Sequence, residues 1–123
     1  MRLLILTTVF FILSCEDSSV SSDDYFSPVP IDNFRLLDHS GKSHELFYYD
    51  DASAIVIMVH GNGCPIVRNA LPDFSALKSG FDNKNIRFFL LNSNLQDTRQ
   101  SIAKEAEEWG ITIPILVDES QLI

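Results

Sequence analysis

The chain has 123 residues, of which 46% are hydrophobic and 21% are charged, and its formal net charge is −8. This length has room for one domain. The acidity argues against nucleic acid or an anionic membrane surface as partner, although it identifies no ligand by itself.

The first 14 residues have the pattern of a signal peptide. Arg2 gives a basic start, and the apolar residues 3–13 that follow are too few to span a bilayer. Residues 12–15 resemble a bacterial lipobox, which implies cleavage before Cys15 and lipidation of its sulfur; the alternative is an ordinary secretory signal with an incidental cysteine. Glu16 stands where a signal for inner-membrane retention would prefer Asp. We therefore expect a lipoprotein of a bacterial envelope that faces the periplasm, on the outer rather than the inner membrane.

Residues 15–32 have the composition of a flexible, lipid-anchored linker. They are rich in Ser and Asp, with prolines near the end, and offer little apolar area to offset the entropy of ordering. The globular domain is predicted to cover residues 33–123. Two short apolar runs, 33–37 and 44–48, flank the glycine turn 38–42 and predict a β-hairpin or a strand with an edge segment.

The next stretch places a cysteine between a strand and a helix. The apolar residues 54–59 predict a strand buried on both faces of a parallel sheet, and the turn 60–63 follows. Pro65 suits the first turn of a helix, where its missing N–H needs no partner. Cys64 is then at or next to the N-cap, a position that favours the reactive thiolate.

The pattern after this helix predicts a strand, a helix and a strand. Residues 86–91 form the first strand, and Asp97 with Gln100 predicts a capping box at the start of the helix. That helix carries an apolar stripe and ends at a glycine; these residues are Ile102, Ala103, Ala106, Trp109 and Gly110. Residues 111–117 form the last strand, in which Pro114 indicates a sheet edge or a bend. This alternation is typical of right-handed βαβ units on a parallel sheet.

Residues 64–72 resemble the active-site helix of the thioredoxin superfamily, most closely its TlpA-like and redoxin (AhpC/TSA) branch. Pro72 holds the place of the proline that kinks this helix in the family. Residues 34–42, 85–94 and 109–118 resemble further segments of the family in the same order. The resemblance implies a thioredoxin-like three-layer α/β/α sandwich. It also implies that the cis-proline loop, the last strands and the final helix of the family are missing from this chain.

The chain departs from the family at the positions that define its enzymes. Val67 stands where a CxxC motif has its second cysteine, so Cys64 has no partner thiol once Cys15 is lipidated. The peroxiredoxin motif PxxxTxxC is absent, because Ile57 and Gly61 replace its proline and threonine. Met58 replaces the buried acid that thioredoxins place six residues before the cysteine.

Each candidate residue also has a structural interpretation. Cys64 is the expected nucleophile, with Pro65 beside it, and the alternative is a buried, inert cysteine. His60 could contact the thiolate or be an ordinary loop histidine, and Arg68 could bring positive charge to the sulfur or be a solvated helix residue. Gly63 is a possible supporting residue of the site, and its structural interpretation is either the geometry of the turn or the close approach of a partner backbone.

Two functions remain open. In the first, the protein is a thiol oxidoreductase whose single cysteine exchanges with periplasmic thiol/disulfide proteins or small thiols, or reduces a peroxide. In the second, it is a non-catalytic, redoxin-derived binding or assembly module of the cell envelope. No phosphate loop, carboxylate pair or zinc pattern occurs in the sequence, so we expect no cofactor and no metal.

Overall fold

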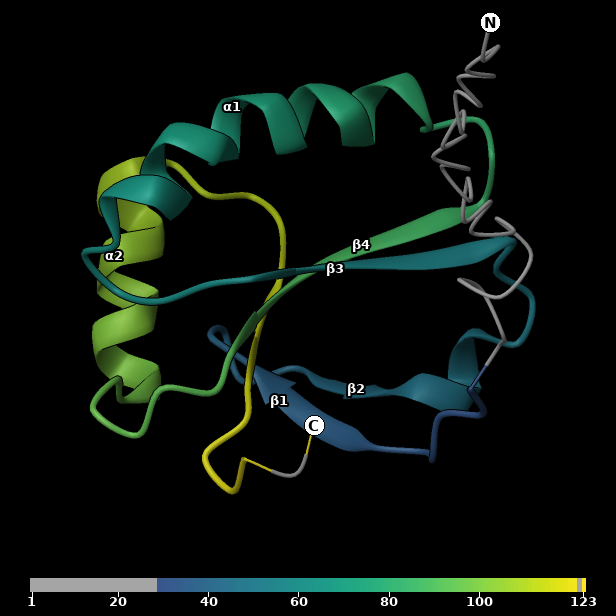
Figure 1. Cartoon of the computed structure of the whole chain (residues 1–123), viewed down its shortest axis with the longest axis horizontal. Helices are drawn as coiled ribbons and strands as arrows, with labels where there is room; N and C mark the ends of the chain where they lie inside the picture. Colours follow the sequence, from purple (N-terminus) through teal and green to yellow (C-terminus); the bar gives the residue numbers. More distant parts are fainter. Residues whose placement is uncertain (1–28, 122) are drawn as a thin grey trace, which may run out of the picture. The chain divides into compact units, whose positions relative to one another are not determined.

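Five strands form one mixed sheet in the order β2-β1-β5-β4-β3. Figure 1 shows the hairpin of β1 and β2 and, next to helix α1, the paired strands β3 and β4. The computed structural model describes residues 29–121 and 123. In chain order the elements are β1 (Arg35–Asp38), β2 (Ser43–Glu45), the 3-10 helix η2 (Leu46–Tyr49), β3 (Ala54–Val59), α1 (Pro65–Gly80), β4 (Ile86–Asn92), α2 (Arg99–Trp109) and β5 (Ile115–Val117). Strands β3, β4 and β5 are parallel, and β1 is antiparallel to both of its neighbours. The predicted α/β fold with a parallel core is confirmed.

From Phe88 to Asn92, strand β4 is buried on both faces of the sheet. Because side chains alternate along a strand, Phe88 and Leu90 point to one face and Phe89 and Leu91 to the other. Leu90 is fully buried at the centre of the first face.

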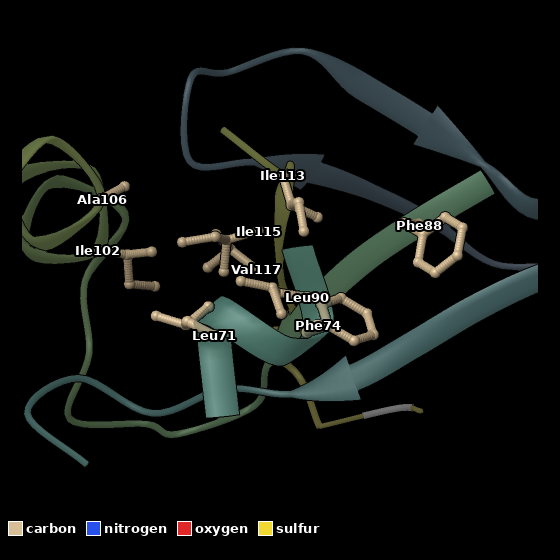
Figure 2. Close-up of a cluster of buried hydrophobic side chains, with 9 residues drawn as sticks. All are labelled: Leu71, Phe74, Phe88, Leu90, Ile102, Ala106, Ile113, Ile115 and Val117. Atoms are coloured by element: carbon tan, nitrogen blue, oxygen red, sulfur yellow. The ribbon is translucent and has the colours of Figure 1, made fainter. Parts of the chain in front are cut away.

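Both helices pack on that first face. Leu71 and Phe74 from α1 and Ile102 and Ala106 from α2 join one apolar cluster with the sheet (Figure 2). The opposite face carries a smaller cluster formed by Phe89, Leu91 and Leu116, with Phe34, Leu36, Tyr49 and Ile55 against it. Within residues 29–121 and 123, therefore, the second helical layer of the expected sandwich is not present.

Strand β3 is not buried on both faces, and that prediction is wrong. It pairs only with β4 among the described strands and forms one edge of the sheet. Ile57 is 38% exposed and Val59 73% exposed, while Val56 and Met58 pack on the first cluster. The apolar run indicates burial of one face, and composition alone could not show that the other face is exposed beyond Ile55, which packs on the second cluster.

The last predicted strand is shorter than expected and is not at an edge. Only Ile115–Val117 is extended in the sheet, and β5 lies between β1 and β4. Pro114 precedes the strand, and its carbonyl oxygen accepts a hydrogen bond from the Leu90 amide at 2.9 Å. The proline therefore lies in the irregular segment that leads into an interior strand. Of the two predictions for Pro114, a bend is confirmed and a sheet edge is wrong.

The predicted hairpin is confirmed, since β1 and β2 pair antiparallel around the turn. Its second strand ends at Glu45, and Leu46–Tyr49 turn into η2 instead of continuing in the sheet.

Helix α2 begins one residue later than the predicted capping box. Thr98 is the N-cap, and its side chain accepts a hydrogen bond from the Ser101 amide at 3.1 Å. Asp97 does not cap the helix; its carboxylate accepts hydrogen bonds from Asn62, Asn92 and Asn94 instead. Gly110 ends the helix in the left-handed conformation with φ of +65°, as predicted.

Candidate active site

Cys64 lies at the N-cap of α1, where the sequence places it. Its backbone is extended, with φ of −70° and ψ of 115°, and Pro65 is the first helical residue. The Cys64 carbonyl accepts the first bond of the helix, from the Arg68 amide at 3.0 Å. Cys64 is half-buried, and its side chain makes no capping hydrogen bond. The thiol therefore stays available at the positive end of the helix dipole.

A tight turn precedes the cysteine. The Cys64 amide donates to the Gly61 carbonyl at 3.2 Å, which closes a four-residue turn. Gly63, the third residue of this turn, has φ of +70°. A positive φ at this position is typical of a type II turn and favours glycine, which supports the structural role predicted for Gly63.

Two carboxylates of the α2 region hold this turn. The Asn62 amide donates to Asp97 Oδ2 at 2.9 Å, and the Gly63 amide donates to Glu105 Oε2 at 2.6 Å. The Asn62 side-chain amide also donates to Ser101 Oγ at 3.1 Å. Hydrogen bonds to an ionised acceptor are stronger than those between neutral groups, so α2 fixes the turn firmly.

Asp97 also binds the end of β4. Its Oδ2 atom accepts from Asn92 Nδ2 at 2.9 Å and from Asn94 Nδ2 at 3.2 Å. Asn92 is buried, and its Oδ1 accepts from the Asn94 amide at 2.9 Å. These two bonds together fix the orientation of the Asn92 amide, with the nitrogen toward Asp97.

His60 is buried beneath the turn, with its side chain fully inaccessible to solvent. Its Nδ1 is 3.3 Å from Asn92 Nδ2, and its Nε2 is 3.5 Å from Glu105 Oε1. Burial lowers the pKa of His60 below its ordinary value; the charge of Asp97 opposes this shift and that of His39 adds to it. At neutral pH the ring is thus uncharged, and its nitrogen atoms face Asn92 and Glu105.

Arg68 contacts the ring of Trp109. Its guanidinium carbon lies 5.2 Å from the ring centroid, which is the range of a cation–π interaction. Both residues line a groove of about 400 Å³ between the two helices, and Pro72, inside α1, lines it too. Arg68 is therefore held in this groove by an aromatic partner, an arrangement that neither interpretation of the sequence included.

The residues that support the cysteine turn were not predicted from the sequence. Asp97, Ser101 and Glu105 follow one another at intervals of four, so they lie on one side of the α2 region. This polar stripe runs beside the apolar stripe that the sequence did reveal. The signal was present in the spacing, but nothing in it indicated which loop the stripe would meet.

A second polar cluster lies apart from these residues, in the hairpin. His44 Nε2 is 2.8 Å from Asp38 Oδ2, and His44 Nδ1 is 2.6 Å from the Tyr49 hydroxyl. Burial raises the pKa of Asp38, but hydrogen bonds from Ser40, His44 and Lys42 outweigh it and leave the pKa below its ordinary value. This cluster ties the hairpin to η2.

A scan against family models matches residues 28–123 to the AhpC/TSA family. The match covers most of the chain, and the protein therefore belongs to this family, whose fold is thioredoxin-like. No curated protein matches the sequence.

Solved structures give the same fold. An uncharacterized conserved protein from Geobacillus kaustophilus is 31% identical with a TM-score of 0.63, and the match covers 74% of this chain and 51% of that one. Peroxidoxin BcpB from Mycobacterium tuberculosis is 21% identical with a TM-score of 0.59, covering 72% and 56%. A thiol:disulfide interchange protein from Chlorobium tepidum TLS is 16% identical with a TM-score of 0.62, covering 75% and 61%. The matched part is thus between half and two thirds of each neighbour.

Cys15, the signal peptide and most of the linker lie outside the described residues. Among residues 29–121 and 123, no helix has the length and apolar character needed to cross a bilayer.

Proposed function

We propose that the protein is a thiol-based oxidoreductase that uses Cys64 as its single nucleophile. The observation that carries this proposal is the position of Cys64, half-buried at the N-cap of α1 with Pro65 as the first helical residue. A thiolate is stabilised at such a helix end, and membership of the AhpC/TSA family makes redox chemistry the natural use of it.

The chemistry has two routes. With a disulfide R–S–S–R′, the Cys64 thiolate attacks one sulfur, a bond to R–S forms, and R′–S⁻ leaves and takes up a proton. With a peroxide ROOH, the thiolate attacks the terminal oxygen, the O–O bond breaks, ROH leaves after protonation, and Cys64 becomes a sulfenic acid.

The return step needs a second thiol, and residues 16–123 contain none besides Cys64. The only other cysteine in the sequence is Cys15, which is the proposed lipid site. In the disulfide route, an external thiol attacks the mixed disulfide, and Cys64 is freed as a new disulfide departs. In the peroxide route, one external thiol condenses with the sulfenic acid and releases water, and a second thiol then frees Cys64 as a disulfide departs.

The same proposal gives the protein a place in the cell. Lipidation of Cys15 would anchor the chain to a bacterial envelope membrane, the outer more than the inner, with the domain facing the periplasm. Its partners there would be thiol/disulfide proteins, small thiols or peroxides. The resemblance of residues 12–15 to a lipobox supports this placement.

The test is turnover by the full chain carrying Cys15→Ser, in a nonionic detergent. Reduction of 2-hydroxyethyl disulfide and of hydrogen peroxide is measured with excess dithiothreitol as the resolving thiol. We expect a rate above background that scales with protein and is abolished by adding Cys64→Ser. Equal rates for the two variants with both substrates would contradict the proposal.

That negative result would favour the alternative, a non-catalytic binding or assembly module. The specific observation on its side is that Val67 and Met58 replace the second cysteine and the buried acid found in dithiol enzymes of the superfamily.

A further inference from the structure

Negative charge is built into the turn that presents Cys64. The amides of the two residues immediately before the cysteine, Asn62 and Gly63, donate to Asp97 and Glu105. Glu105 is held close to the protein, with only 13% of its side chain exposed. The carboxylates are therefore fixed parts of the cysteine's surroundings and not mobile surface groups.

His60 does not neutralise this charge. The fixed orientation of Asn92 directs an N–H donor at His60 Nδ1, so Nδ1 must accept and the ring proton must be on Nε2. A second proton on Nδ1 would face the Asn92 donor and force that amide to turn, which would break its bond to Asp97. Geometry and burial thus both keep the ring neutral.

The position of Glu105 is set from both sides. Its Oε2 holds the Gly63 amide, while its Oε1 faces the proton-bearing Nε2 of His60 at 3.5 Å. Oε1 and Nε2 are both buried without a hydrogen-bond partner, and Asn62 Oδ1 is a third such atom. These unused polar atoms converge on the same turn, and the first two need only a slight approach to bond to each other.

The nearby cations make their contacts with residues other than these two carboxylates. Arg68, one helical turn past Cys64, lies over the Trp109 ring, and Lys104, next to Glu105, pairs with Glu108 at 3.6 Å. In the part of the chain that the structure describes, neither Asp97 nor Glu105 pairs with Lys or Arg.

We propose that Glu105 is a positioning and specificity-determining residue for Cys64, and that with Asp97 it selects disulfides and thiols that carry positive charge beside their sulfur. The inference rests on the proposed function of Cys64 and names its substrate class. A disulfide flanked by lysine or arginine in a protein fits this class, whereas a thiol flanked by carboxylates does not.

Covalent geometry limits how far the charge can be from the sulfur. Gly63 is adjacent to Cys64 and consecutive Cα atoms are 3.8 Å apart, so the Glu105 carboxylate lies within about 10 Å of the sulfur. One charge at about 10 Å in water changes the ratio of rates for a cationic and an anionic reagent by about fourfold. The effect is larger where the protein lowers the local dielectric constant.

Three methanethiosulfonate reagents that differ in charge provide the measurement. They are the trimethylammonium-ethyl (cationic), methyl (neutral) and sulfonatoethyl (anionic) compounds, reacted with the full Cys15→Ser chain in nonionic detergent at about 10 mM ionic strength, where the screening length is about 30 Å. Each cation-to-anion ratio of rates is divided by the same ratio for 2-mercaptoethanol.

Glu105→Gln removes the charge but leaves an oxygen that can accept from Gly63. Glu107→Gln is the matched control, because Glu107 is exposed on the same helix and its loss changes the net charge equally. We expect a normalised ratio above about fourfold for the unmutated Glu105 protein, a fall of about fourfold or more in Glu105→Gln, and little change in Glu107→Gln. The neutral reagent reports any change of accessibility or fold.

A further measurement needs no variant at Glu105. Raising the salt to about 1 M shortens the screening length to about 3 Å, so the normalised ratio should fall toward one. A ratio near one at low salt, or equal falls in Glu105→Gln and Glu107→Gln, would overturn the inference. If 2-hydroxyethyl disulfide is still turned over, those results overturn only the charge selectivity and leave the oxidoreductase proposal standing. If that turnover is lost as well, both the selectivity and the oxidoreductase proposal are wrong.

Discussion

Gly63 is the residue on which the geometry before Cys64 depends most directly. Its φ of +70° is a conformation that other residues adopt only with strain, and a Cβ added there would meet no atom within 4 Å. Gly63→Ala should therefore lower the free energy of unfolding by about 1 to 2 kcal/mol through backbone strain alone. Urea unfolding followed by circular dichroism measures this change.

Gly61→Ala is the matched control for Gly63→Ala. Gly61 has no positive φ and the same open space around its Cα, so its free energy of unfolding should stay the same or rise by up to about 1 kcal/mol. Equal losses in the two variants would contradict the assigned strain.

Asp38 gives the fold a specific dependence on pH. Its folded-state pKa lies below the ordinary 3.8, so the ionised carboxylate stabilises the fold above that value, and the contribution is lost as pH falls through the folded pKa. Asp38→Asn should cost about 2 to 4 kcal/mol at pH 7, since it leaves His44 and the turn amides poorly paired.

The measurement is urea unfolding of both proteins from pH 7 to pH 2. The difference between the unmutated protein and Asp38→Asn should shrink as the pH falls below about 4. Asp73→Asn, at an exposed position of α1, should show a small difference at every pH. A gap for Asp38→Asn that is constant with pH would contradict the account.

At the level of elements, substitutions at the start of α2 can distinguish the observed N-cap, Thr98, from the predicted capping box. Thr98→Ala should reduce the free energy of unfolding by about 1 kcal/mol, because it removes the acceptor for the Ser101 amide. Gln100→Ala, which alters the expected capping-box partner, should have an effect below about 0.5 kcal/mol. Thermal unfolding of both variants, and of Thr98→Ser, which keeps the hydroxyl, measures these losses. A larger loss for Gln100→Ala than for Thr98→Ala would contradict Thr98 as the cap and favour the predicted capping box.

The elements around Cys64 could be predicted from sequence because the signals there are local. A β-branched run, a glycine turn and the Cys64-Pro65 pair each act within a few residues, and the strand, turn and helix follow them. The contacts of Asp97 and Glu105 with the turn could not be predicted, since they join residues 35 and 42 positions apart in the chain. Such pairs depend on how α2 is seated on the sheet, and no local pattern encodes that.

For the whole molecule, one apolar cluster joins both helices to the sheet, and Leu90 is its fully buried centre. Leu90→Ala should cost about 2 to 5 kcal/mol in the free energy of unfolding, through lost burial and the cavity left behind. Leu95→Ala, at a position that is 69% exposed, should cost less than about 0.5 kcal/mol. Similar urea midpoints for the two variants would show that the cluster is not the core of the fold.

The order of strands and helices along the chain could be predicted from the sequence. The exposure of β3 at the edge of the sheet could not. Strands β3 and β4 are both rich in apolar residues, yet Val59 is 73% exposed and its registered partner Leu91 is buried. Which run becomes interior depends on how many neighbours the sheet supplies on each side, a property of the assembled chain.

The rate of disulfide exchange at Cys64 tests the proposal that the fold presents this residue as a reactive nucleophile. The Cys15→Ser chain is mixed with 2-hydroxyethyl disulfide at pH 7, and the mass increase at Cys64 is followed by intact-mass spectrometry, both folded and in denaturing urea. We predict that the folded chain reacts about threefold faster than the unfolded one, because only the folded chain places the sulfur at a helix N-terminus, where the gain in thiolate is partly offset by its lower nucleophilicity. A folded chain that reacts no faster than the unfolded one would contradict the account.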